Sequence, residues 1–178
     1  MDRFWCVTVI FNPAGYRSRL DNYYTFRERL DKQNVKLLTV ELAFNDQEHS
    51  IPAGDRVLHL RSNSVLWQKE RLLNYAMDNL PPECDMVGWL DSDLLLPDGW
   101  DAEVVRKLEK VDFVQLFEKV VHLKQGDRRY AGERIDVKQG IVWQNKLYGK
   151  NWLPYRQSRQ IFHSEPGYGW AAKRRAFQ

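Results

Sequence analysis

Short apolar runs alternate with amphipathic stretches along most of the sequence. A continuous apolar run of about four to eight residues is typical of a buried strand, whereas apolar residues three and four apart indicate a helix. Strands separated by helices favour an α/β fold with a mostly parallel central sheet and helices on both faces. The runs predict strands at residues 4–11, 35–44, 57–60, 86–90 and 113–123, and helices at about 18–32, 65–79 and 101–110.

Local residue types mark the ends of some of these elements. Ser64 is a predicted N-cap for the helix over residues 65–79, and Pro81-Pro82 stops that helix. Residues 124–162 show little periodicity, so we expect a long loop there. Residues 163–172 are first Gly-rich and then apolar, which predicts a loop that enters another strand or helix.

The length of 178 residues fits one domain, and we expect residues 1–178 to form it. Hydrophobic residues make up 43% of the chain and aromatic residues 13%, which is enough apolar surface for a folded core. Cys6 and Cys84 are too few and too far apart for a disulfide framework or a zinc site. The apolar run at the N-terminus is too short to span a membrane and lacks the form of a secretion signal, so we expect a soluble, cytoplasmic chain.

The charge is unevenly distributed, although the formal net charge is only +3. Nine basic residues lie between positions 124 and 159, against three acidic ones (Lys or Arg at 124, 128, 129, 134, 138, 146, 150, 156 and 159; acids at 127, 133 and 136). A basic region suits an anionic substrate or nucleic acid, and it is equally compatible with a solvated loop.

The triplet Asp91-Ser92-Asp93 is the strongest sign of chemistry, because it directly follows the apolar run 86–90. Two carboxylates at the end of a strand can share one hard cation, Mn²⁺ or Mg²⁺, which completes its shell with phosphate oxygens and water. Ligands of parallel sheets bind at the carboxyl ends of the strands. This rule predicts that Asn12, Glu41 and Asp91 lie along one edge of the sheet.

The residues from Met86 to Trp100 resemble the Asp-x-Asp segment of the GT-A glycosyltransferases, especially the family-2-like group. In these enzymes an apolar strand ends in the acidic triplet, and a Pro-Asp-Gly-like turn begins the next helix. The stretch 67–80, with Lys69 five residues before Asn74, is similar to a helix of that family, and 167–175 is similar to its Gly-rich acceptor-side segment. The resemblance implies a GT-A (Rossmann-like) fold and metal-dependent transfer of a sugar from a UDP- or GDP-linked donor. The acceptor hydroxyl would belong to a glycan, a lipid or a protein.

The resemblance also implies roles for individual residues. Asp93 would bind the metal directly, and Asp91 would bind the ribose or bind the metal through water. Lys69 would reach the diphosphate. The remaining implied contacts are Asn12 and Pro13 around the nucleoside, Glu41 on the base, Gly169 and Trp170 on the substrate, and His163 as a late metal ligand.

The general base is the part of the family pattern that this sequence does not show. Inverting members carry an Asp or Glu after the Gly-rich segment, and the sequence ends at Gln178 before such a residue. We therefore expect a chain truncated at its C-terminus, with the base beyond Gln178. Glu165 is the nearest acid within the sequence.

Three other functions remain open from the sequence. A haloacid-dehalogenase-like phosphatase also places Asp-x-Asp at a strand end, although normally near the N-terminus and before Thr or Val, where this chain has Leu94. A nucleic-acid-binding module could use the basic and aromatic residues of 128–156, but no nucleic-acid-binding signature accompanies them. A nucleotidyltransferase would carry a Gly-rich loop with Lys or Arg after its first strand, which residues 12–17 match weakly.

Overall fold

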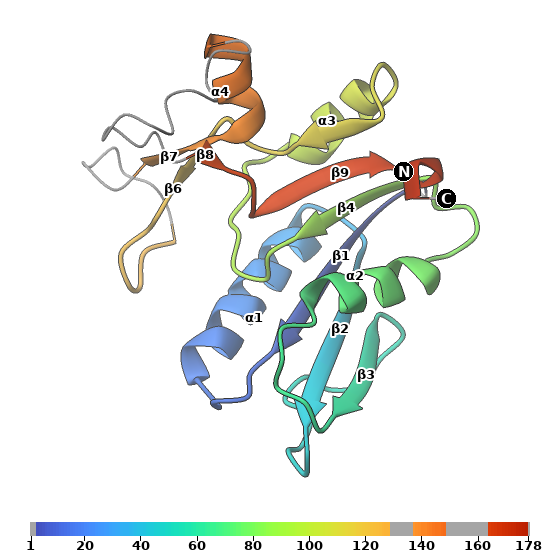
Figure 1. Ribbon diagram of the computed structural model, residues 1–178, viewed down its shortest axis with the longest axis vertical. Helices are drawn as coiled ribbons and strands as arrows, with labels where there is room; N and C mark the ends of the chain where they lie inside the picture. The colour runs from blue at the N-terminus through green and yellow to red at the C-terminus, as the bar shows by residue number, and fades with distance from the viewer. Residues whose placement is uncertain (1–2, 129–136, 149–163, 178) are drawn as a thin grey trace. The chain divides into compact units, whose positions relative to one another are not determined.

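The structure is a computed structural model that describes residues 3–128, 137–148 and 164–177 (Figure 1). Its contacts divide the chain into two compact units. The first comprises Met1–Val114 and Trp170–Gln178, and the second comprises Gln115–Gly169. The single domain expected from the sequence stays a prediction.

A six-stranded sheet with the order β3-β2-β1-β4-β9-β5 forms the centre of the first unit. β1 pairs in parallel with β2 and with β4, and β2 pairs in parallel with β3. Figure 1 shows β9 running opposite to β4, so the sheet is mixed but mostly parallel. This architecture confirms the predicted α/β class. The strands are β1 (Phe4–Phe11), β2 (Leu37–Phe44), β3 (Val57–Ser62), β4 (Met86–Leu90), β5 (Phe113–Gln115) and β9 (Gly169–Lys173).

Helices cover both faces of this sheet, as the continuous apolar character of β1 and β2 requires. On one face, Val7 and Val9 of β1 belong to the same buried cluster as Leu72 and Leu73 of α2. On the other face, the Tyr23 hydroxyl of α1 lies 3.0 Å from the Thr39 hydroxyl of β2. The helices of this unit are α1 (Arg17–Lys32), α2 (Lys69–Asp78), α3 (Trp100–Leu108) and the short 3₁₀ helix η2 (Arg174–Phe177).

The predicted element boundaries were wrong in two places of the first unit. The helix expected from residue 65 begins at Lys69, and its N-cap position is Gln68 rather than Ser64. Ser64 instead stabilises a turn, since its backbone N–H donates to the Ser62 hydroxyl at 3.0 Å. The single strand expected over 113–123 is two strands in two different sheets, because the chain leaves the six-stranded sheet after Gln115.

The second unit contains a three-stranded sheet with the order β6-β7-β8. Its elements are β6 (Lys119–Val121), β7 (Val137–Gly140), α4 (Ile141–Tyr148) and β8 (Ser164–Glu165). β7 and α4 lie within the stretch that was expected to be loop. Their sequences are short and poorly amphipathic, so periodicity gave no signal for them. The Gln115 side chain organises this unit, donating to the Glu165 carbonyl at 2.9 Å and accepting from the Val142 N–H at 3.0 Å.

Within the described residues, no helix is both long and apolar enough to cross a membrane.

Candidate functional site

The candidate site lies at the carboxyl ends of β1 and β4, which are neighbours in the sheet. From β1 the chain continues through α1 to β2 on one side, whereas β4 pairs with β1 on the other side. The connections that leave the carboxyl ends of β1 and β4 therefore run in opposite directions. This is a switch point, the usual ligand position in such sheets. Asp91 directly follows the last residue of β4, Leu90. The buried Thr8 hydroxyl of β1 donates to the Leu90 carbonyl at 2.8 Å and so fixes the start of the acidic triplet.

Lys69 and Asp91 meet at this edge of the sheet. Lys69 is the first residue of α2, and its ammonium group forms an ion pair with the Asp91 carboxylate. The two side chains are 25% and 28% exposed, so solvent screens the pair only in part. The structure thus brings together two residues, 22 positions apart, that the sequence analysis had assigned to one diphosphate site.

Asp93 is exposed to solvent, yet neighbouring protein removes part of the hydration of its carboxylate. This desolvation raises the pKa of Asp93, and the negative charge of Asp91 raises it further. Lys69 and Arg19 lower the same pKa, by a smaller amount. Asp93 is thus a carboxylate whose ionised form is disfavoured by its surroundings, with cations close by, and such a group suits a divalent cation and an anionic ligand.

The loop after β1 is held by Asn12. The Asn12 side chain accepts from the Tyr16 N–H at 2.9 Å and donates to the Tyr16 carbonyl at 2.8 Å. Gln47, from the loop after β2, donates to the Pro13 carbonyl at 3.1 Å. The Asn12 amide is thus engaged in the loop itself, and the predicted nucleoside contact of Asn12 and Pro13 stays a prediction.

Arg19 is a site residue that the sequence analysis missed. It lies in the first turn of α1, donates to the Phe11 carbonyl at 3.4 Å, and acts electrostatically on Asp93. A signal for it was present, since the first turn of the helix that follows a strand lies at the carboxyl edge of a parallel sheet. Arg19 differs from the other charged residues of α1 only in lying close to the end of β1.

Glu41 does not lie at the strand end where it was expected. β2 continues to Phe44, and Glu41 is buried with its carboxylate accepting from the Ser50 and Ile51 N–H groups at 2.6 and 3.0 Å. His59 of β3 is 3.4 Å from the same carboxylate. These contacts hold the loop between β2 and β3, and they give Glu41 a structural role. The predicted contact with the base stays a prediction.

Other predicted residues belong to other parts of the chain. Glu165 is in the second unit, where it forms an ion pair with Lys138 at 3.5 Å. Gly169 and Trp170 begin β9. His163 and most of the basic segment lie outside the described residues.

The structure describes no group of three or more His, Cys, Asp or Glu side chains that could hold a metal ion. The acidic triplet nonetheless fits a metal of a particular kind, because Mg²⁺ and Mn²⁺ bind through one or two carboxylates together with phosphate oxygens and water. Asp93 suits this role better than Asp91, which is already paired with Lys69.

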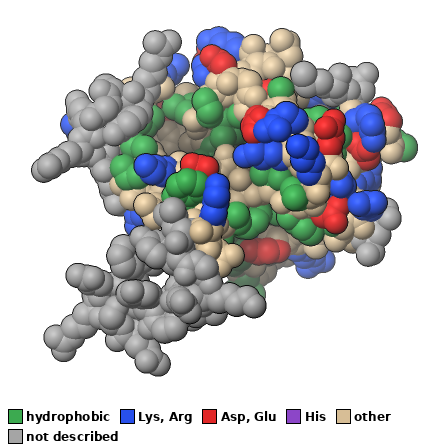
Figure 2. Space-filling view, turned by 90° about the horizontal axis from the view of Figure 1, so that it is seen from above, with side chains coloured by type: hydrophobic (Ala, Val, Ile, Leu, Met, Phe, Trp, Pro, Cys, Tyr) green, Lys and Arg blue, Asp and Glu red, His purple; other side chains and the backbone are tan. Residues whose placement is uncertain are grey.

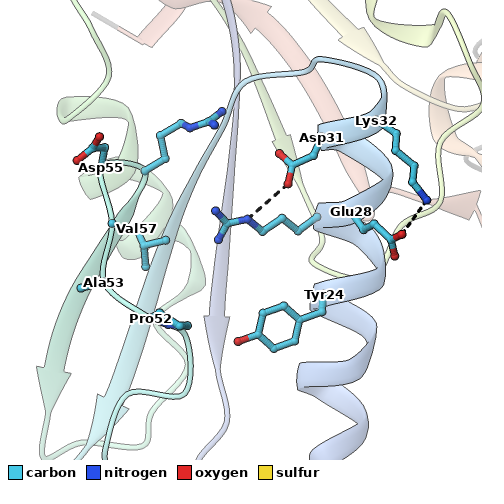
Figure 3. Close-up of a pocket in the computed structure, with 11 residues that line it drawn as sticks. Tyr24, Glu28, Asp31, Lys32, Pro52, Ala53, Asp55 and Val57 are labelled. Carbon is cyan, nitrogen blue, oxygen red and sulfur yellow. Dashed lines mark hydrogen bonds and ion pairs between the residues drawn. The ribbon is translucent and has the colours of Figure 1, made fainter.

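A hollow of about 750 Å³ lies away from these residues. Figure 3 shows Tyr24, Glu28 and Asp31 of α1 on one side of it and residues 52–57 on the other. Because residues 52–57 lead into β3, the hollow is at the opposite end of the parallel strands from Asp91. Two of the carboxylates that line it are paired locally, Asp31 with Arg27 at 3.8 Å and Glu28 with Lys32 at 2.7 Å. We therefore place the chemistry at the switch point.

Basic and acidic side chains are interspersed on the face seen in Figure 2. Exposed ion pairs of the first unit include Arg106–Glu103 and Arg175–Asp112. No protein-family model matches the chain, and no curated protein is similar to it.

Proposed function

We propose that this chain is a metal-dependent glycosyltransferase of the GT-A kind that transfers a sugar from a nucleoside-diphosphate donor to an acceptor hydroxyl. The observation that carries the proposal is the meeting of Lys69, Asp91 and Asp93 at the switch point of a mostly parallel sheet. This position in the fold favours a nucleotide ligand. The charges present suit a diphosphate that binds together with a divalent cation.

The chemistry of sugar transfer matches these charges. Breaking the bond between a sugar and a diphosphate places negative charge on the leaving group, and cations fixed at that point stabilise the charge as it develops. Among the residues that the structure describes, Lys69 and Arg19 are cations that act on Asp93. In the absence of ligand Lys69 is paired with Asp91, and a diphosphate oxygen can replace that carboxylate as its partner.

Asp93 and, through water, Asp91 would hold Mn²⁺ or Mg²⁺. When bound, the ion supplies a Lewis acid that neutralises charge on the diphosphate. The raised pKa of Asp93 fits this role, because a cation relieves the repulsion between the two carboxylates.

Calorimetric titration of UDP and GDP, with and without Mn²⁺, tests the proposal. We expect one nucleotide to bind in a metal-dependent manner, and Asp93→Ala to abolish that binding. Asp98→Ala is a matched control, because Asp98 is an exposed acid seven positions after Asp91 that pairs with Arg29 at 3.0 Å. Absence of nucleotide binding to the wild type under every metal condition, or equal loss in both variants, would overturn the proposal.

A further inference from the structure

Trp67 is an unusually exposed aromatic residue beside the candidate site. Its relative exposure is 67%, whereas large aromatic side chains usually bury most of their surface. It lies two positions before Lys69, in the loop between β3 and α2. Its neighbours Val65 and Leu66 are also exposed, at 64% and 75%. An exposed apolar group of this kind, next to a charged site, marks a surface that contacts a ligand.

The Trp67 ring is held in position although it is exposed. It packs edge-to-face against Phe11 of β1, with ring centroids 5.5 Å apart and an interplanar angle of 85°. Its indole N–H donates to the Glu70 carboxylate at 3.3 Å. A T-shaped contact covers at most one face of an indole ring, so the high exposure leaves the other face open. A ring that is already fixed loses little side-chain entropy when a ligand stacks on it.

The ring is tied to the same cluster as the charges. Phe11, which Trp67 contacts, also accepts the hydrogen bond from Arg19, and Arg19 acts on Asp93. Lys69, at the start of the next helix, pairs with Asp91. An open aromatic face therefore accompanies the two cations on the β1 side of the acidic triplet.

We propose that Trp67 is the stacking platform for the nucleobase of the ligand whose diphosphate binds at Lys69 and Asp93. This inference rests on the proposed function and adds the residue that recognises the base. A planar base, rather than the sugar, is the matching group, because aromatic faces stack on aromatic faces with little regard to the base's hydrogen-bonding pattern. Trp67 thus contributes affinity for a nucleoside as such, and a purine gains more from it than a pyrimidine.

The test compares ligands that differ only in the base. GDP, UDP and inorganic pyrophosphate are titrated calorimetrically with Mn²⁺ into the wild type, Trp67→Ala and Trp67→Phe. We expect Trp67→Ala to weaken binding of each nucleotide that the wild type binds by about tenfold or more, with the larger loss for GDP where both bind, and to leave pyrophosphate binding unchanged. Trp67→Phe, which keeps an aromatic face, should restore most of the affinity. Leu66→Ala is the control, since it shortens a neighbouring exposed side chain without removing a ring.

Three outcomes would overturn the inference: no change in nucleotide affinity on Trp67→Ala, an equal loss for pyrophosphate, or an equal loss in Leu66→Ala. These results differ from failure of the proposed function, in which the wild type binds neither nucleotides nor pyrophosphate. Thermal unfolding of each variant, followed by circular dichroism, shows whether that variant is folded under the conditions of the titration. The Trp67→Phe result keeps the test decisive if the alanine variant is unstable.

Discussion

Lys69 and Asp91 form an ion pair that joins the start of α2 to the end of β4 at the switch point of the sheet. The pair holds the start of the acidic triplet against the first residue of α2. It also helps to accommodate two acids that are two positions apart, because Lys69 lowers the pKa of Asp93 and so offsets part of their repulsion.

Replacing Lys69 with Met should weaken binding of UDP or GDP in the presence of Mn²⁺ by about tenfold or more, since a charge-assisted contact to the diphosphate is lost. Calorimetric dissociation constants measure the effect. Lys107→Met is the control, because Lys107 is a half-exposed lysine of α3 that pairs with Glu103 at 3.6 Å. Unchanged nucleotide affinity in Lys69→Met would exclude the assigned role of this lysine.

Asp93→Asn should be at least as stable as the wild type at neutral pH when no metal is present. Because the pKa of Asp93 is raised in the folded protein, its contribution to stability is fully present below the pKa of the unfolded chain and is lost as the pH rises through the folded pKa. The advantage of the variant should therefore disappear at about pH 4. Thermal unfolding in EDTA at both pH values measures the difference in stability between the variant and the wild type. A variant clearly less stable at neutral pH would show that desolvation and the charge of Asp91 do not disfavour the ionised form of Asp93.

Glu41→Gln should lower the free energy of unfolding by about 1–3 kcal/mol. The buried carboxylate accepts hydrogen bonds from two backbone N–H groups, and in the variant one of these groups faces an amide NH₂ group, which cannot accept. Urea denaturation measures the loss. If Glu41 is structural, the folded variant keeps the wild-type ratio of UDP to GDP affinity. A changed ratio with little loss of stability would instead support the contact with the base that the family resemblance implies.

Arg174→Met should lower the free energy of unfolding by about 2–3 kcal/mol. The Arg174 guanidinium donates to four backbone carbonyls at and after the end of α2, those of Met77, Leu80, Pro81 and Cys84, at 2.8–3.5 Å. Within the described part of the chain, the neighbouring Arg175 bonds to exposed Asp112, so Arg175→Met should change stability by less than about 1 kcal/mol. Urea denaturation compares the two, and equal losses would show that the carbonyl contacts contribute little.

Much of the central sheet could be predicted because its strands are buried on both faces and therefore read as continuous apolar runs. β1 and β4 match their predicted bounds for this reason. The start of α2 was misplaced because Leu66 lies seven positions before Leu73 and so continues the apolar stripe of the helix, although the structure leaves Leu66 exposed in a loop. The spacing of apolar residues shows which of them would share one face of a helix. It does not show whether that face is buried.

The family resemblance singled out the acidic triplet and Lys69, and the structure brings Lys69 and Asp91 into contact. Their roles in ligand binding stay predictions. Arg19 was not predicted, although its position in the first turn of the helix after β1 was a signal for it. Trp67 was not predicted because its relation to the site depends on a contact with Phe11 that no local pattern encodes. Glu41 was expected at the end of its strand, whereas β2 continues three residues beyond it to Phe44. The break after Gln115 was missed because the apolar run continues beyond it, while the pairing partners change.

Electron paramagnetic resonance of Mn²⁺ tests the central claim most directly. The signal of free Mn²⁺ is recorded with nucleotide alone, with protein alone, and with protein and UDP or GDP together. The proposed site predicts that the complete mixture removes more free Mn²⁺ than the two separate mixtures account for, and that Asp93→Ala abolishes this excess while Asp98→Ala keeps it. A complete mixture that removes no more Mn²⁺ than its separate parts, for both nucleotides, would contradict a metal-bound nucleoside diphosphate at Asp93.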